Sequence, residues 1–363
     1  MKIAVYAISK NESKFVQRWV DSMSEADAVY VCDTGSADDT VSQLRDRGVV
    51  VNEIFLGDWR FDVARNISLS FVPDDVDVCV CTDLDEILEP GWRQHVEAAF
   101  ADLSITRMKY WYTWNFLPDG KPGTQFWYDK VHLRHGYQWI HPVHEVLKYY
   151  NGPESYAFND KMRLNHYPDP SKSRSSYLHL LEQSVKEDPN DDRNMHYLGR
   201  EYTFYNQWEK AIDTLKRHLQ LPSATWAAER ATSMRLIAKS YAMLNDIPNA
   251  HHWYKMATIE DPTLREAWYD LALAMQQSGQ HLDAYYAAKK GLEIHDMNGT
   301  YIHDPAAWSG LLEDICAVSS WYLGLKRESL KYTSLAVVKC SDERVLKNYH
   351  FITTACGVQN DTN

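Results

Sequence analysis

Short apolar runs alternate with amphipathic stretches over the first part of the chain. The apolar runs are rich in Val and Ile, have the length of strands, and lie at 3–9, 28–33, 49–55 and 76–83. Between them, apolar residues recur at helical spacing over 12–23, 38–47 and 61–71. Strands that alternate with helices are typical of βαβ units. The pattern therefore predicts a mostly parallel sheet.

From about Ser171 onward the pattern changes to one helix after another, and it repeats. Three sets of apolar and small residues recur: Met195, Leu198, Gly199, Tyr202, Ala211 and Leu215; then Met234, Ile237, Ala238, Tyr241, Ala250, Tyr254, Ala257 and Pro262; then Trp268, Leu271, Ala272, Met275, Ala284 and Ala288. The last two sets are offset by 34 residues, the tetratricopeptide period, whereas the first two are offset by 39, which indicates an insertion. A degenerate fourth unit over 308–341 is expected to cap the array.

These two sequence patterns predict an α/β domain over 1–170 followed by an all-α domain over 171–363. A chain of 363 residues is longer than one hydrophobic core usually serves, and 45% hydrophobic residues are enough for two cores. No apolar segment approaches the roughly 18 to 20 residues of a membrane-spanning helix. The opening MKIAVYAISKNE turns polar too soon for a signal peptide. We expect a cytoplasmic protein without a membrane span.

Net charge and cysteine spacing disfavour two classes of function, general nucleic-acid binding and a cysteine zinc cluster. A net charge of −12 disfavours general binding to nucleic-acid backbones, although a local basic patch remains open. The six cysteines show no C-x-x-C spacing, and Cys79 and Cys81 would point to one face of a strand. Buried reduced thiols, and no cysteine zinc cluster, are expected.

Charged residues gather where the predicted strands end. The segments 10–12, 33–36 and 83–86 follow the first, second and fourth strands, and ligands of parallel sheets bind beyond these ends. Asp83 and Asp85 are spaced to share a hard cation such as Mn or Mg, with Glu86 orienting them. A strand-ending turn or a helix N-cap is the alternative. The other D-x-D, at 75–77, precedes its strand and is expected to be a solvated turn.

A hard cation held by few carboxylates usually completes its coordination with substrate phosphates, which suggests a nucleotide diphosphate. The sequence contains neither a Walker motif nor G-x-G-x-x-G, so neither a P-loop nor a dinucleotide-binding site of the Rossmann type is expected. The remaining common use of such a site is sugar transfer from a nucleotide donor.

Five short motifs, in order, then give a family resemblance. They are ISKNE at 8–12, DTGSADDT at 33–40, WRFDVARN at 59–66, DLDE at 83–86 and VHE at 143–145. With them, residues 1–170 resemble family 2 glycosyltransferases of the GT-A fold, specifically those fused to a tetratricopeptide domain. The resemblance implies a Rossmann-like mixed sheet. It also implies metal-dependent transfer of a sugar from a nucleotide-diphosphate donor, expected to be a UDP-sugar, to a hydroxyl-type acceptor with inversion.

The same resemblance implies which residues bind the nucleotide-sugar donor, and they lie in and near these motifs. The nucleotide-sugar-binding residues expected are Ser9, Glu12, Asp33, Arg65, Asp83, Leu84 and Lys172. Asp33 is expected to accept from the uracil or ribose, although an Asx turn or N-cap is compatible with its position. Arg65 is expected to face Asp83 or a phosphate, with an ordinary surface arginine as the alternative. Lys172 is expected on the diphosphate, or else in a solvated helix start.

The resemblance also implies a metal site and a catalytic base. Asp85 is the expected ligand of Mn or Mg, with Asp83 and His166, which ends a short strand before the helical domain. Glu145 is expected to take a proton from the acceptor. His144 is expected either to orient that base or to reach the metal. A surface turn begun by Pro142 is the alternative for this segment.

The acceptor stays open between a modified DNA base, a protein side chain and a glycan. The aromatic residues expected near it, or else in the core, are Trp111, Tyr112, Trp114, Trp127, Tyr128 and Trp139. A basic segment that could meet phosphates is formed by Lys130, His132, Arg134 and His135. The helical domain could bind a peptide, position a polymer or form a homo-oligomer. The rival from another class is a non-catalytic tetratricopeptide adaptor with a decayed nucleotide-binding domain.

Overall fold

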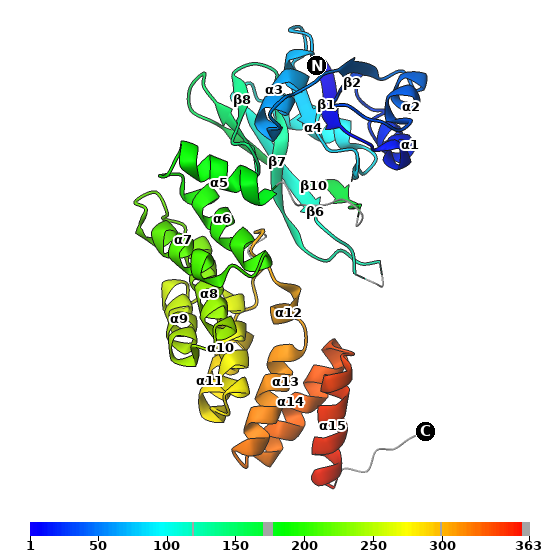
Figure 1. Cartoon of the computed structure of the whole chain (residues 1–363). Coiled ribbons are helices and arrows are strands. Elements are labelled where there is room, and N and C mark those ends of the chain that lie inside the picture. Colours follow the sequence, from blue (N-terminus) through cyan, green and yellow to red (C-terminus); the bar gives the residue numbers. More distant parts are fainter. Residues whose placement is uncertain (118–119, 170–176, 298–299, 358–363) are drawn as a thin grey trace, which may run out of the picture. The chain divides into compact units, whose positions relative to one another are not determined.

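The computed structural model describes residues 1–117, 120–169, 177–297 and 300–357, and these divide into two compact units (Figure 1). The first unit comprises Met1–Ser184 together with Thr300 and Tyr301, and the second comprises the other described residues from Val185 onward. The predicted boundary between residues 170 and 171 precedes helix α5 (Tyr177–Glu187), whose first residues belong to the first unit.

A sheet of eight strands forms the first unit. Its strands are β1 (Ile3–Ser9), β2 (Ala28–Asp33), β3 (Val50–Glu53), β4 (Val78–Cys81), β5 (Glu86–Leu88), β6 (Arg107–Thr113), β7 (Gln125–Leu133) and β10 (Tyr156–His166). The strand order is β3-β2-β1-β4-β7-β6-β10-β5. Strands β3, β2, β1 and β4 are parallel neighbours, as are β6 and β10, whereas β7 is antiparallel to β4 and β6 and β5 is antiparallel to β10. The sheet is therefore mixed.

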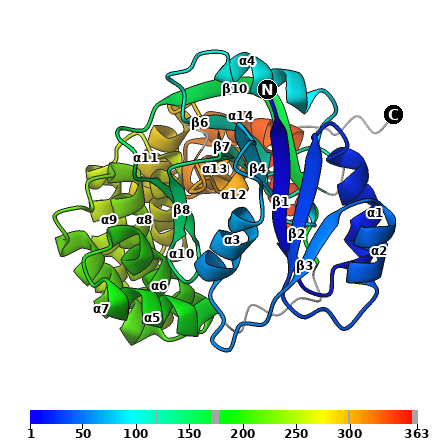
Figure 2. The ribbon, with the colours of Figure 1, turned by 90° about the horizontal axis from the view of Figure 1, so that it is seen from above.

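Elements on both faces bury this sheet (Figure 2). The flanking elements are α1 (Ser13–Ser22), α2 (Thr40–Asp46), α3 (Phe61–Ser70), α4 (Trp92–Phe100) and the hairpin of β8 (Tyr137–Ile140) and β9 (Val146–Tyr149). Val5 belongs to one core, with Trp19 of α1 and Trp92 of α4, and Tyr6 belongs to the other, with Trp139 of β8. Alternate residues of a strand point to opposite faces, so burial on both faces explains the nearly continuous apolar runs.

The predicted elements of the βαβ region are present. Strands β1 and β2 begin and end at the predicted residues, and β3 and β4 are shorter than predicted. Cys79 and Cys81 are buried free thiols in one core cluster, as expected, and burial raises the pKa of both.

Paired helices form the second unit (Figure 1). They are α6 (Asp192–Phe204) with α7 (Trp208–Gln220), α8 (Ala227–Met243) with α9 (Ile247–Glu260), α10 (Arg265–Gln277) with α11 (His281–Leu292), and α13 (Leu311–Tyr322) with α14 (Lys326–Lys339). Short α12 (Pro305–Trp308) precedes the fourth pair, and α15 (Glu343–Ala355) follows it. The expected fourth unit is present, but α15 continues past residue 341, so that unit is not the end of the array.

One turn geometry recurs in all four pairs. The turn that follows the first helix of each pair contains a residue with a positive φ, and it is Asn206, Asn245, Gly279 or Gly324. Asn and Gly are the residues that end helices in the left-handed conformation at low cost. The recurring turn and the 34-residue spacing identify an all-helical domain of the tetratricopeptide type. Within the described residues, no helix combines the length and apolarity needed to cross a membrane.

Candidate functional site

The loop after β2 is organised by the carboxylate of Asp33, which is buried at the end of the strand. Its Oδ1 accepts from the main-chain N–H groups of Gly35 and Ser36, at 3.0 and 2.8 Å. Its Oδ2 accepts from the hydroxyls of Ser9 and Ser36, at 2.8 and 2.5 Å. This is the Asx turn that the sequence analysis gave as compatible with Asp33. The four donors occupy the roughly four acceptor sites of one carboxylate. Asp33 therefore shapes the loop, and Gly35 permits it with a φ of 99°.

The loop after β1 is tied to the same region. The N–H of Glu12 donates to Oγ1 of Thr40 at 2.7 Å, and the N–H of Asn11 donates to Oγ of Ser36 at 2.8 Å. Glu12 is buried at the start of α1. The structure therefore brings Ser9, Glu12 and Asp33 together at the carboxyl ends of β1 and β2.

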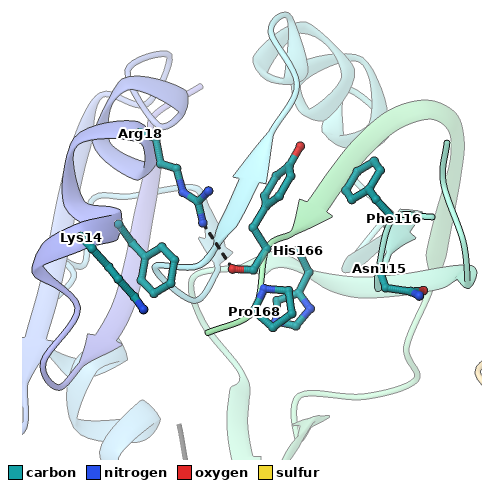
Figure 3. Close-up of a pocket in the computed structure, with 8 residues that line it drawn as sticks. Lys14, Arg18, Asn115, Phe116, His166 and Pro168 are labelled. Atoms are coloured by element: carbon teal, nitrogen blue, oxygen red, sulfur yellow. Dashed lines mark hydrogen bonds between the residues drawn. The ribbon is translucent and has the colours of Figure 1, made fainter. Parts of the chain in front are cut away.

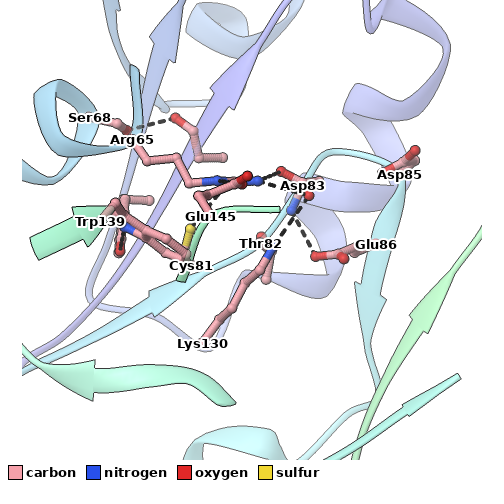
Figure 4. A network of polar contacts seen from close by, with 12 residues as sticks. Arg65, Ser68, Cys81, Thr82, Asp83, Asp85, Glu86, Lys130, Trp139 and Glu145 are labelled. Atoms are coloured by element: carbon pink, nitrogen blue, oxygen red, sulfur yellow. Dashed lines mark hydrogen bonds and ion pairs between the residues drawn. The ribbon is translucent and has the colours of Figure 1, made fainter. Parts of the chain in front are cut away.

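Arg65 connects two carboxylates that lie far apart in the sequence (Figure 4). Its Nε donates to Oε1 of Glu145 at 2.5 Å, and its Nη2 donates to Oδ1 of Asp83 at 2.8 Å. The Arg65 side chain is 4% exposed, so the surface alternative for this residue is wrong. The expected contact between Arg65 and Asp83 is present.

Lys130 adds a second cation to this cluster. Its Nζ lies 3.5 Å from Oδ2 of Asp83, and its side chain is 8% exposed. Burial opposes ionisation of Asp83, but the neighbouring Arg65 and Lys130 outweigh it and lower the pKa of the carboxyl. Burial and Arg65 lower the pKa of Lys130, but Asp83 and its other neighbours outweigh them and raise it well above its usual value.

Glu86 holds the D-x-D loop in shape. Its Oε2 accepts from the N–H of Asp83 at 2.9 Å, and its Oε1 accepts from the hydroxyl of Tyr112 at 2.8 Å. Burial raises the pKa of Glu86. Leu84 is 1% exposed and packs in the core of the sheet, so its side chain anchors the loop and only its main chain is left for a ligand.

Asp85 points away from Arg65 (Figure 4), and its carboxylate pairs with His166. Oδ2 of Asp85 is 3.5 Å from Nε2 of His166, and Nδ1 of His166 lies 2.9 Å from the carbonyl oxygen of Trp114. Because a carbonyl only accepts, Nδ1 carries a proton, and in the neutral ring Nε2 presents a lone pair toward Asp85. Burial opposes protonation of His166, but Asp85 outweighs it and raises the histidine pKa.

The loop between β8 and β9 carries Glu145 and is clamped by α3. The side chain of Asn66 exchanges two 2.8 Å hydrogen bonds with the main chain of Trp139, and the N–H of Phe61 donates to the carbonyl of Pro142 at 2.9 Å. His144 has a φ of 50°, in the left-handed region that non-glycine residues seldom occupy. Its ring meets Tyr177 edge-on, with centroids 5.7 Å apart.

A cavity of about 460 Å³ opens next to His166 (Figure 3). Its lining residues are Lys14, Phe15, Arg18, Asn115, Phe116, His166, Tyr167 and Pro168. The Arg18 guanidinium stacks on Phe15 and on Tyr167, with centroid distances of 4.7 and 4.9 Å. Figure 3 shows Lys14 and Arg18 on one wall and Asn115 and Phe116 on the other. Cations and aromatic rings therefore face each other beside the Asp85 and His166 pair.

In the basic segment, Lys130 and His132 are buried side chains with internal partners, whereas His135 is exposed. Of the aromatic residues expected near an acceptor, Tyr112 and Trp139 are core residues, whereas Trp114 is exposed and Trp111 stacks on Trp127 at 4.6 Å. Lys172 lies outside the described residues.

The sequence analysis missed Lys130 as a partner of Asp83 and missed both cations of the cavity. Lys130 lies at a β-bulge of β7, where the pairing with β6 shifts between Met108 and Tyr110, so regular strand alternation in the sequence did not reveal its position. Lys14 and Arg18 are four residues apart on the helix that follows the first loop, which places them on one face.

Comparisons with known proteins extend only to the helical architecture. No family model matches the chain, and no curated protein matches it. The chain is similar to the solved structure of the MamA protein, with 18% identity and a TM-score of 0.36 over 52% of this chain and 88% of that one. A second similar structure is YrrB, described as a TPR protein with an unusual peptide-binding site, with 12% identity and a TM-score of 0.36 over 50% and 83%. A third is a thermophilic TPR protein of Thermus thermophilus, with 17% identity and a TM-score of 0.35 over 50% and 90%.

Proposed function

We propose that this protein is a metal-dependent glycosyltransferase. It would move a sugar from a nucleotide-diphosphate donor, a UDP-sugar in the first instance, to an acceptor hydroxyl with inversion at the anomeric carbon. The observation that carries the proposal is the pairing of Asp85 with His166 beside a cavity that contains cations and aromatic rings. The five sequence motifs support it, because ISKNE contacts DTGSADDT, and WRFDVARN contacts both DLDE and VHE.

Asp85 and His166 have the donor atoms that Mn²⁺ accepts. The Trp114 carbonyl fixes the His166 ring so that Nε2 faces Asp85, as a second-shell partner of a metal ligand does. Two ligands at about 2.1 Å on adjacent octahedral positions are about 3 Å apart, close to the 3.5 Å between these atoms. Asp83 is engaged by Arg65 and Lys130, so we assign the metal chiefly to Asp85 and His166. When bound, Mn²⁺ or Mg²⁺ would stabilise the charge of the leaving diphosphate.

The other residues of the site would position the reactants. Ser9, Glu12 and Asp33 would form the loop that receives the nucleotide, because their contacts already fix its shape. Lys172 stays assigned to the diphosphate by resemblance alone. The cavity side chains Arg18 and Tyr167 would meet the sugar or the diphosphate, since a ring face suits a sugar and a guanidinium suits a phosphate.

Glu145 is the proposed base for the acceptor hydroxyl. Arg65 binds its Oε1, so the proton would be taken by Oε2. His144, in the same strained loop, would position this carboxylate. The acceptor hydroxyl could belong to a modified DNA base, a protein side chain or a glycan, and a helical domain of this type favours an acceptor presented by a macromolecule.

A second candidate is supported by the same ion pairs. Asp83 and Glu145 share the buried Arg65, as carboxylates with a purely structural role would. A tetratricopeptide adaptor without catalytic activity would use its helical domain for protein contacts and keep the first domain as a folded support.

Thermal shift with a panel of nucleotide sugars, with and without Mn²⁺, separates these candidates. For a transferase, one donor raises the melting temperature only with Mn²⁺, and Asp85→Ala abolishes the shift. Asp75→Ala is the matched control, because it alters the other D-x-D, whose Asp75 pairs with Lys2 at the opposite end of β4. The absence of any shift with every nucleotide and metal would favour the adaptor.

A further inference from the structure

Three charged or metal-binding side chains meet where helices α6, α7 and α8 of the second unit come together (Figure 1). Successive helices run in opposite directions, so the start of α6, the end of α7 and the start of α8 lie at one end of the array. Asp192 is in the first turn of α6, His218 in the last turn of α7, and Glu229 in the first turn of α8. One ligand atom from each residue lies within 4.8 Å of the other two.

His218 supplies an independent observation that points to a ligand. Its side chain is fully buried, with 0% exposure, and its Nε2 makes no hydrogen bond in the described structure. This nitrogen lies 3.4 Å from Oε1 of Glu229, which is longer than the 2.7–2.9 Å of a charge-assisted hydrogen bond. A buried polar atom in this position needs a partner that the protein itself does not supply.

Ser233 fixes the orientation of the imidazole from the other side. Its Oγ lies 2.9 Å from Nδ1 of His218 and 2.7 Å from Nδ1 of His196. A hydroxyl has one proton, so Ser233 donates to one of these nitrogens and accepts from the other. When it accepts from His218, Nε2 carries a lone pair 3.4 Å from the Glu229 carboxylate, and a cation bound there gives Nε2 the partner that it lacks. Such a second-shell hydrogen bond is typical of histidines that bind metals.

We propose that Asp192, His218 and Glu229 form a binding site for a divalent metal ion of the zinc type. Zinc accepts one imidazole nitrogen and two carboxylate oxygens at about 2.0–2.1 Å, and tetrahedral ligands at that distance are about 3.4 Å apart, matching the separation of His218 and Glu229. Asp192 is partly exposed, which leaves room for a solvent ligand at the fourth position. The ion would link three helices of the first two repeats. This site is independent of the proposed transferase site and of the cysteines.

The first test measures zinc content after dialysis of the full chain against Zn²⁺. It uses a background in which Asp85→Ala and His166→Ala remove the ligands proposed in the first unit, so the two sites cannot be confused. We expect one equivalent of zinc in this background and at least a tenfold weaker affinity in His218→Gln. His251→Gln is the control, because His251 is a histidine of the same unit that bonds to Ser278. Ser233→Ala is expected to weaken binding about tenfold through loss of orientation.

Cobalt gives a second readout, because tetrahedral Co²⁺ absorbs visible light far more strongly than octahedral Co²⁺. The background protein should give this strong absorption, and His218→Gln should lose it. Asp192→Asn, at the partly exposed ligand, repeats the test if His218→Gln fails to fold. Full zinc content in a folded His218→Gln or Asp192→Asn protein, or no zinc in the background protein, would overturn the proposal.

Discussion

Nε of Arg65 donates to Oε1 of Glu145 at 2.5 Å and thereby joins α3 to the loop between β8 and β9. The same guanidinium reaches Asp83 at 2.8 Å, so one cation connects three of the five sequence motifs. Asn66, one residue further along α3, holds the main chain of Trp139 in the same hairpin. The FDVARN motif therefore serves as a clamp for the segment that contains the proposed base.

The first prediction concerns the energy of this clamp. Arg65→Met would leave two carboxylates next to a buried, uncharged side chain, and breaking a buried ion pair in this way typically costs about 3–5 kcal/mol. We expect a loss of unfolding free energy of that order in urea. The control is Arg45→Met, since the pair of Arg45 and Glu53 is solvent-exposed and is worth at most about 1 kcal/mol. Equal losses in the two variants would mean that water solvates the Arg65 cluster.

Hydrophobic patterning predicted the fold where strands are short and buried on both faces. β1 and β2 both lie within residues 3–33 and pair in parallel, joined by a crossover helix. The local pattern of apolar residues was therefore enough to predict both strands and the helix between them. In the far half of the sheet only the short strand that ends at His166 was predicted. The strands there mix aromatic and charged residues, and two of the pairings join distant segments, β4 with β7 and β6 with β10. Local sequence does not specify such pairings.

Motifs and their positions at strand ends predicted the main residues of the candidate site. They did not predict which buried side chains contact those residues. Asp85 and His166 were both expected to be ligands, and the structure brings them to 3.5 Å. The role of Lys130 depends on the antiparallel pairing of β7 with β4, which places its side chain next to Asp83. Asp192, His218 and Glu229 meet through helix packing, which no spacing within a single helix reveals.

The second prediction separates the proposed base from donor binding. Glu145→Gln keeps the size of the side chain and an oxygen for Arg65 but removes the basic carboxylate, so transfer should fall by about 10²–10⁴-fold. Donor binding, measured by the Mn²⁺-dependent thermal shift, should persist. Glu154→Gln is the control, because Glu154 is a carboxylate of the same unit that pairs with a different arginine, Arg107. Unchanged transfer in Glu145→Gln would assign the base to another residue.

The third prediction concerns pH and His132. This ring lies between the hydroxyl of Tyr6, 2.9 Å from Nε2, and the carbonyl of Leu133, 2.7 Å from Nδ1. Burial lowers the pKa of His132 to about 3, whereas an unfolded histidine has a pKa near 6.5. Below about pH 6.5 the unfolded state therefore binds a proton that the folded state does not.

The unfolding free energy should consequently be insensitive to His132 above about pH 6.5 and should fall as the pH drops toward 3, by at most about 1.4 kcal/mol per unit. His132→Gln removes the titrating group, so its stability should decline less steeply over this range. The exposed His135→Gln variant should retain the wild-type slope. Identical slopes in wild type and His132→Gln would show that the buried ring is already protonated.

The fourth prediction tests the close approach of the first helix pair. A Cβ added at Gly199 of α6 would lie 2.4 Å from Cγ of Leu215 in α7, and Leu215 is fully buried. Gly199→Ala gains about 1 kcal/mol of helix propensity, but overpacking costs about 1–3 kcal/mol. The steric cost should win, because two carbon atoms of Leu215 lie within 2.5 Å of the added Cβ. We expect a net loss of up to about 2 kcal/mol in urea unfolding.

A double variant, Gly199→Ala with Leu215→Ala, tests whether the clash with Leu215 causes the loss of stability in Gly199→Ala. Leu215→Ala alone should cost about 2–5 kcal/mol through the cavity that it leaves, and the methyl group that Gly199→Ala introduces would occupy part of that cavity. The Gly199→Ala and Leu215→Ala pair should therefore lose clearly less stability than the sum of the single losses, with a coupling of at least about 0.5 kcal/mol. Additive losses would show that the two helices lie further apart than the contact between Gly199 and Leu215 requires.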